Sequence, residues 1–146
     1  MKKFVLVAVM ASSLVSGQAM AACTNATRLN AAQISALLGG NTVCVPAVTA
    51  NPMTWQELHQ GTSGGALVDY KRGPGHPVDP SETVGTWTVN GGGQGNSSVT
   101  HVYSGAGGSY TYTVHGSGAV GTNHSFCPIA GGAEIVARVK PSGGAC

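Results

Sequence analysis

Apolar and polar residues alternate with a period of two in short runs from residue 42 onward, which predicts β-strands. Glycine-rich segments such as 61–64, 91–93 and 105–108 separate these runs and have the length and composition of hairpin loops. The predicted strands are Thr42–Ala47, Met53–Gln60, Gly65–Lys71, Val84–Asn90, Ser97–Tyr103, Ser109–His115, Thr122–Cys127 and Ala133–Lys140. About eight short strands in succession predict a mainly β fold, an antiparallel meander that forms either a small barrel or a sandwich.

One short helix is predicted ahead of the strands, over residues 31–38. Asn30 can cap it and Gln33 completes a capping box, while Leu29 and Ile34 are spaced for a hydrophobic staple. Ala31, Ile34, Leu37 and Leu38 share one face, and Gly39-Gly40 supplies the residues that end a helix. Because so short a helix is not stable alone, it must pack against the strands.

The first residues have the three parts of an export signal. Lys2 and Lys3 are followed by an apolar run from Phe4 to Val15, and Ala19-Met20-Ala21 fits the site at which a signal peptidase cuts. The sequence therefore predicts a signal peptide over 1–21, a single domain over 22–146, and a periplasmic or secreted protein. The apolar run is too short to be retained as a transmembrane span.

Removal of this signal changes the charge of the chain. The precursor has seven Lys and Arg against five Asp and Glu, and loss of Lys2 and Lys3 leaves five of each. A neutral domain without a basic patch does not fit a nucleic-acid partner. Low net charge weakens the repulsion between copies, so self-association is compatible with this composition.

Four cysteines, Cys23, Cys44, Cys127 and Cys146, remain after the signal. An even number in an oxidising compartment predicts disulfides, and three connectivities are open. The spacing does not suit a zinc site. Cys23 also has a second interpretation, since Met20-Ala21-Ala22-Cys23 approximates the box that precedes a lipid-modified cysteine.

The strand pattern places several chemically capable side chains on shared faces. Trp55, Glu57 and His59 share one strand face, and His101 shares another with Tyr103. Convergence of several of the five histidines would be needed for a metal site. The alternative is that these polar groups alternate outward on half-exposed strands.

The aromatic residues are most of the large side chains that the domain has. Trp55, Tyr70, Trp87, Tyr103, Tyr110 and Tyr112 build either a packed core or, if their faces point into a barrel, a small pocket edged by hydroxyl groups.

The segment from Tyr70 to Pro80 combines Lys71, Arg72, His76 and Asp79 with three prolines. Loops carry function more often than strands do, so these residues are candidates for ligand binding. The alternative is that the segment closes one end of a barrel, with Asp79 bonding nearby backbone N–H groups.

Signals for catalysis are weak. Gly-x-Ser-x-Gly spacing occurs only at residues 61–65, in a glycine-rich segment between two predicted strands, and not between a strand and a helix. Asp79 and Glu82, a carboxylate pair suited to glycoside cleavage, lie three residues apart in a predicted Pro-Ser turn. No catalytic residue, bound metal or cofactor is predicted.

Several motifs together resemble a group of small exported proteobacterial proteins of unknown function. They are the capped helix with Gly40-Asn41-Thr42, Trp55-Gln56-Glu57, Asp69-Tyr70-Lys71, Gly73-Pro74-Gly75-His76-Pro77-Val78-Asp79-Pro80, Gly85-Thr86-Trp87 and Ser125-Phe126-Cys127. The resemblance implies a periplasmic β-domain and carries no catalytic residue.

The function predicted from the sequence is non-enzymatic binding of a small molecule or a macromolecular partner. The binding candidates are Trp55, Glu57, His59, Tyr70, Lys71, Arg72, His76, Asp79, His101 and Tyr103. A self-assembling surface subunit with exposed β-edges is one alternative. A metal-dependent or hydrolytic enzyme is the other.

Overall fold

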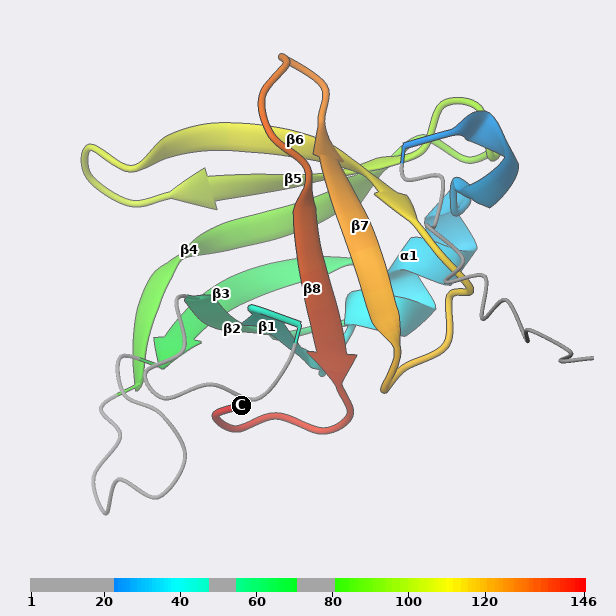
Figure 1. The fold of residues 1–146 in the computed structure, drawn as a ribbon. Helices are drawn as coiled ribbons and strands as arrows, with labels where there is room; N and C mark the ends of the chain where they lie inside the picture. The colour runs from blue at the N-terminus through cyan, green and yellow to red at the C-terminus, as the bar shows by residue number, and fades with distance from the viewer. Residues whose placement is uncertain (1–22, 48–54, 71–80) are drawn as a thin grey trace, which may run out of the picture.

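The computed structural model describes residues 23–47, 55–70 and 81–146 (Figure 1). A short 3-10 helix, η1 (Asn25–Thr27), precedes the α-helix α1 (Ala31–Leu38). Eight strands follow: β1 (Thr42–Val45), β2 (Trp55–His59), β3 (Gly64–Tyr70), β4 (Ser81–Asn90), β5 (Ser98–Tyr103), β6 (Gly108–His115), β7 (Asn123–Pro128) and β8 (Ile135–Lys140). None of the helices in the described residues is long and apolar enough to cross a membrane.

The strands form a closed antiparallel barrel in sequence order, and β1 completes the circle by pairing with β8. Thr42 lies opposite Lys140 in that closing pair, and Val43 lies opposite Val139. The predicted mainly β meander is therefore confirmed, and the barrel is the form that it takes. Every described strand pairs with two neighbours, so the exposed β-edges expected of a self-assembling subunit are not found among them.

Helix α1 covers one end of the barrel and forms as its capping pattern predicts (Figure 1). The Asn30 side chain accepts from the Gln33 backbone N–H at 2.9 Å, and the Gln33 side chain accepts from the Asn30 N–H at 2.9 Å. Gly40, with a φ of +73°, allows the chain to leave the helix. The apolar face of the helix is buried in the core with Trp87 of β4 and Val99 of β5. The end of the barrel near α1 is thus filled by apolar packing.

The strand β4 begins earlier than the pattern indicates. It starts at Ser81, and Ser81 and Glu82 pair with Tyr70 and Asp69 of β3. The prediction that Glu82 lies in a Pro-Ser turn is therefore wrong, because cross-strand pairing extends β4 toward the prolines. Asp79, the other member of the suggested carboxylate pair, lies outside the described residues.

Two disulfides attach the ends of the described chain to the barrel wall. Cys23 is bonded to Cys127 of β7, and Cys44 of β1 is bonded to Cys146. The sulfur of Cys23 is thus held in a disulfide in this structure. Disulfides are compatible with an oxidising extracellular or periplasmic location.

The C-terminal segment lies over the outer face of β1 and β2. The Thr42 hydroxyl donates to the Gly144 carbonyl at 2.9 Å, and the Cys146 N–H donates to the Gln56 side chain at 2.7 Å. The disulfide therefore holds the C-terminus against the strand that closes the barrel.

Removal of either disulfide should destabilise the barrel by a similar amount. The two close loops of nearly equal length, with sequence separations of 104 and 102 residues. Loop-closure entropy alone gives about 4–5 kcal/mol for each. We expect the Cys23→Ala/Cys127→Ala and Cys44→Ala/Cys146→Ala variants to lose comparable free energies of unfolding in urea titrations. A large loss for one pair with no loss for the other would contradict this account.

Candidate functional site

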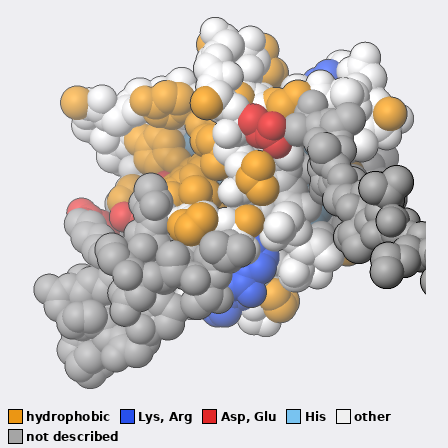
Figure 2. Space-filling view, in the orientation of Figure 1, with side chains coloured by type: hydrophobic (Ala, Val, Ile, Leu, Met, Phe, Trp, Pro, Cys, Tyr) orange, Lys and Arg blue, Asp and Glu red, His pale blue; other side chains and the backbone are white. Residues whose placement is uncertain are grey.

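Aromatic and titratable side chains line the barrel interior from His59, whose ring lies 5.1 Å from that of Trp87, to the end opposite α1. Strand alternation directs Trp55, Glu57 and His59 of β2 to the interior, and the pairing of Glu57 with Asp69 and of His59 with Leu67 continues this face onto β3. The inward face of β5 carries His101 and Tyr103, and that of β6 carries Tyr110 and Tyr112, with His101 directly opposite Tyr110. Figure 2 shows hydrophobic side chains gathered at this side of the molecule.

The exposures of these side chains give the depth of the site. Tyr110 is 50% exposed and lies at the rim, whereas Tyr112 is 7% exposed. Glu57 is 3% exposed, and His59 and His101 are fully buried. The chemistry therefore changes from aromatic rings at the rim to a carboxyl group and an imidazole pair inside.

Glu57 is a buried carboxyl group held by hydrogen bonds. The Tyr103 hydroxyl donates to Glu57 Oε2 at 2.9 Å. Burial raises the pKa of Glu57 to about 7, against the opposing effect of hydrogen bonds from Trp55 and Tyr103, and the nearby Asp69 raises it further. Near neutral pH this carboxyl group is thus divided between its protonated and ionised forms.

Tyr103 is held protonated by the same surroundings. Burial and the neighbouring Glu57 carboxyl group raise the pKa of the Tyr103 hydroxyl. Its proton is engaged on Glu57, so the hydroxyl acts as a hydrogen-bond donor at this site.

His59 and His101 form a hydrogen-bonded pair whose tautomers follow from their partners. Burial lowers the pKa of His59 well below its usual value and that of His101 to about 4, so both rings are neutral near pH 7. His59 Nδ1 lies 3.2 Å from the Glu57 carbonyl oxygen, which can only accept, so Nδ1 carries the hydrogen. His59 Nε2 is then an acceptor.

The second ring completes this chain. His101 Nε2 lies 3.1 Å from His59 Nε2 and must therefore donate to it. A neutral His101 with its hydrogen on Nε2 has a bare lone pair on Nδ1. This buried Nδ1 has no hydrogen-bond partner in the described part of the chain. The series of hydrogen bonds that runs from the Glu57 carbonyl through His59 to His101 thus ends at His101 Nδ1, which can accept a hydrogen bond but has no donor among the described residues.

Aromatic rings surround His101. Ring centroids lie 5.6 Å away for Tyr112, 6.1 Å for Trp55 and 6.3 Å for Tyr103. Trp55 and Tyr103 also hydrogen-bond to Glu57. The carboxyl group and the imidazole therefore share two aromatic neighbours, although they lie on different strands.

The structure brings together five of the sequence-predicted binding residues: Trp55, Glu57, His59, His101 and Tyr103. The alternative that the polar members of this set point outward is wrong, because barrel closure buries that strand face. Tyr70 does not join them, since it alternates with the inward-facing Asp69, and its carbonyl accepts from the Gln56 side chain at 3.2 Å. Lys71, Arg72, His76 and Asp79 lie outside the described residues.

The sequence pattern does not assign Asp69 to the site. It indicates that Tyr110 and Tyr112 belong to either a packed core or a small pocket, without choosing between them. Asp69 has a signal that could have revealed it, because it is spaced by two from the apolar Leu67 and so shares its face. Its placement opposite Glu57 depends on strand register, which the pattern does not give.

The other two described histidines, His115 and His124, form hydrogen bonds with backbone groups. His115 Nδ1 lies 2.9 Å from the Thr24 carbonyl and Nε2 lies 2.8 Å from the Thr113 hydroxyl. His124 Nδ1 lies 3.1 Å from the Thr122 carbonyl, and its Nε2 accepts from the Gly118 N–H at 3.1 Å. Within the described residues, no group of three or more His, Cys, Asp or Glu side chains is arranged to hold a metal ion.

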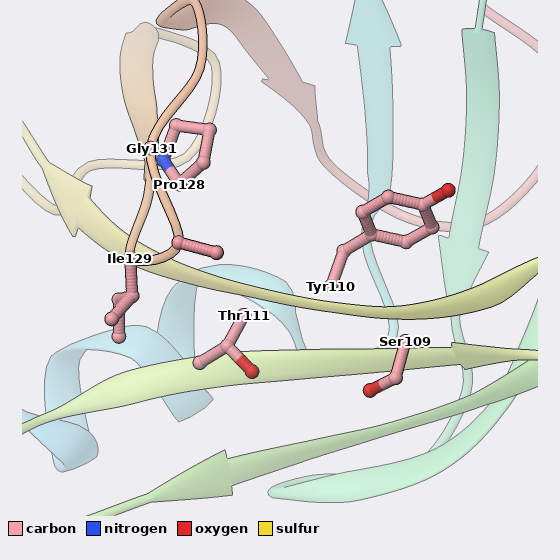
Figure 3. A pocket seen from close by; sticks show the side chains of 7 residues that line it. Ser109, Tyr110, Thr111, Pro128, Ile129 and Gly131 are labelled. Atoms are coloured by element: carbon pink, nitrogen blue, oxygen red, sulfur yellow. The ribbon is translucent and has the colours of Figure 1, made fainter.

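A hollow of about 450 Å³, called the outer groove below, lies between β6 and the segment where the chain leaves β7, beside the rim residue Tyr110 (Figure 3). It is lined by Ser109, Tyr110, Thr111, Pro128, Ile129, Ala130 and Gly131. Its polar side chains are the two hydroxyl groups of Ser109 and Thr111 and that of the rim residue Tyr110. This outer groove therefore has less chemistry for recognition than the interior.

Comparison with known proteins does not extend this description: no family model matches the chain, and no curated protein or solved structure matches it.

Replacement of Glu57 by Gln should change how stability depends on pH. The pKa of folded Glu57 is about 7 against a usual 4.5, so the folded state holds this proton more tightly than the unfolded state. Stability contributed by Glu57 is therefore lost as the pH rises from about 4.5 to about 7. Glutamine does not titrate, so the Glu57→Gln variant has no such loss. As the pH rises from acidic to mildly alkaline, the free energy of unfolding of Glu57→Gln should therefore increase relative to that of the wild type, by up to about 3 kcal/mol.

Urea titrations of both proteins at about pH 4 and about pH 8 measure this change. Glu134→Gln, which removes an exposed carboxylate, controls for the loss of one negative charge. A stability difference between Glu57→Gln and wild type that is the same at both pH values would contradict the buried carboxyl group.

Proposed function

We propose that this protein binds a small molecule inside the barrel, through the end opposite α1. The observation that carries the proposal is the fully buried His101, whose Nδ1 lone pair lacks a partner among the described residues and which lies among aromatic rings. A buried polar atom left without a hydrogen bond costs about 1–3 kcal/mol, and a ligand donor would recover this free energy.

The contrast between the apolar and the polar parts of the interior supports binding over simple core packing. The end near α1 is filled by Ile34, Leu37, Leu38 and Val99, which are fully buried. The rest of the described interior instead buries a carboxyl group and two imidazoles, one of them with its ring 5.1 Å from that of Trp87, and these groups are expensive to desolvate. Apolar residues of similar size would stabilise the barrel more, so we attribute the polar lining to recognition of a ligand.

The state of the hydroxyl group at the site supports binding over hydrolysis. The Tyr103 hydroxyl donates a hydrogen bond to Glu57, and the raised pKa of this hydroxyl keeps it protonated. A lowered pKa favours a nucleophile, whereas the pKa of the Tyr103 hydroxyl is raised. Tyr103 and Glu57 therefore serve as a fixed polar pair that orients a bound molecule.

The proposed place of action is the periplasm or the outside of a bacterial cell. The export pattern of residues 1–21 and the resemblance to small exported proteobacterial proteins support this part of the proposal. The two disulfides are compatible with it.

Binding can be tested with the neutral fluorescent probe N-phenyl-1-naphthylamine, whose emission rises in apolar surroundings. We expect a saturable increase at one probe per barrel. Trp55→Ala should weaken probe binding by about tenfold, because an aromatic wall of the site is lost.

Ile129→Glu is the matched control, since the 58% exposed Ile129 lines the outer groove and not the interior. It should leave probe binding unchanged. A non-saturable signal in wild type, or a loss of binding in Ile129→Glu with none in Trp55→Ala, would overturn interior binding.

A further inference from the structure

We propose, on the basis of the proposed function, that the ligand of the barrel is a protonated organic amine that carries N–H donors and an aromatic or apolar body. Three properties of the interior select this class: its charge, its hydrogen-bonding groups and its aromatic lining.

The charge of the described interior is acidic. Glu57 and Asp69 lie directly opposite each other on β2 and β3. The described basic residues of the barrel wall, Arg138 and Lys140 of β8, alternate with the buried Ala137 and Val139 and so lie on the outer face. A ligand with a positive charge complements the ionised Glu57 carboxylate, whereas an anionic ligand would be repelled by it.

The hydrogen-bonding groups of the interior are acceptors. The tautomers of His59 and His101 leave His101 Nδ1 with a lone pair that can accept a hydrogen bond. The Glu57 carboxylate accepts a hydrogen bond from Tyr103 and can accept others. Both acceptors lie beside Trp55 and Tyr103. An ammonium group brings up to three N–H donors to these acceptors, whereas a hydroxyl group brings one.

The aromatic lining suits both parts of such a ligand. The rings of Tyr103 and Tyr110 lie 5.9 Å apart at the rim, and Tyr112 lies deeper, between His101 and Phe126. The faces of aromatic rings attract cations, and their area accommodates an apolar body. An amine with an aromatic group would thus be held at both ends.

The inference predicts that affinity rises with pH. Burial raises the pKa of Glu57 to about 7, so below this pH the empty site must release a proton before it can pair with an ammonium group. His59 and His101 stay neutral above about pH 6 because burial lowers their pKa, and burial raises the pKa of Tyr103 and Tyr112. Asp69, the remaining acidic neighbour, raises the pKa of Glu57. Affinity for an amine should therefore increase from about pH 6 to about pH 8, where alkylamines remain protonated.

Isothermal titration calorimetry with four related compounds tests the class. The probes are 2-phenylethylamine, trimethyl(2-phenylethyl)ammonium, 2-phenylethanol and 3-phenylpropionate. We expect 2-phenylethylamine to bind about tenfold or more tightly than the neutral alcohol, because its N–H groups make charge-assisted hydrogen bonds, and the carboxylate to bind least. The trimethylated cation keeps the charge without N–H donors and should bind several-fold more weakly than the primary amine.

Two variants connect these preferences to residues. Glu57→Gln should remove most of the preference for amine over alcohol and the rise in affinity with pH. Glu134→Gln removes an exposed carboxylate and should leave both unchanged. His101→Phe should remove the preference for the primary amine over its trimethylated form, and the same comparison in wild type tests the acceptor if this variant fails to fold.

The outcomes separate this inference from the proposed function. If 2-phenylethanol binds as tightly as 2-phenylethylamine, or if all four compounds fail while N-phenyl-1-naphthylamine still binds, the amine class is overturned and interior binding stands. If the neutral fluorescent probe also fails to bind, both are overturned. Equal affinity for the amine in wild type and Glu57→Gln would likewise overturn the assigned role of the carboxylate.

Discussion

The pairing of β1 with β8 determines the environment of every residue at the site. Thr42, Val43 and Cys44 lie opposite Lys140, Val139 and Arg138, and this short antiparallel ladder turns an eight-stranded sheet into a closed barrel. In an open sheet the face that bears Glu57 and His59 could lie in water. Closure places it inside, so the shifted pKa values and the unpartnered His101 nitrogen all depend on these pairs. The Cys44–Cys146 disulfide attaches the C-terminus to the same closing strand.

The interior has an apolar half that stabilises the fold and a polar half that costs stability, and the two meet where the rings of His59 and Trp87 lie 5.1 Å apart. The first half is packed beneath α1, with Trp87 donating to the Gln60 carbonyl at 2.7 Å so that its one polar atom is satisfied. The second half buries Glu57, His59 and His101 at the expense of desolvation. Such a separation is common where binding chemistry is placed on a rigid scaffold, because the packed half supplies the free energy that the polar half consumes.

The helix, the strands and the residues that share a strand face could be predicted from the sequence, because interactions between residues close in sequence determine them. The capping box of Asn30 and Gln33 fixed the start of α1, and period-two alternation located the eight strands. Alternation also placed Glu57 with His59, and His101 with Tyr103, on shared faces. It could not show that these faces point inward, because an alternating strand has the same pattern whichever face is buried.

The remaining features depend on contacts between residues distant in sequence. The approach of His59 to His101 joins β2 to β5, and the choice among three disulfide connectivities required the assembled barrel. Glu82 was misplaced because pairing with β3 extends β4 beyond what its own residues indicate. Raised and lowered pKa values follow from burial, so they could not be inferred before the fold was known.

The tautomers of the two buried histidines test the account most directly, because the acceptor without a partner at His101 Nδ1, which carries the proposed function, follows from them. Nitrogen-15 NMR of histidine-labelled protein at about pH 7 reports which ring nitrogens carry hydrogen. The account predicts two neutral rings, His59 with its hydrogen on Nδ1 and His101 with its hydrogen on Nε2. A protonated imidazolium at either position, or a His101 hydrogen on Nδ1, would contradict it.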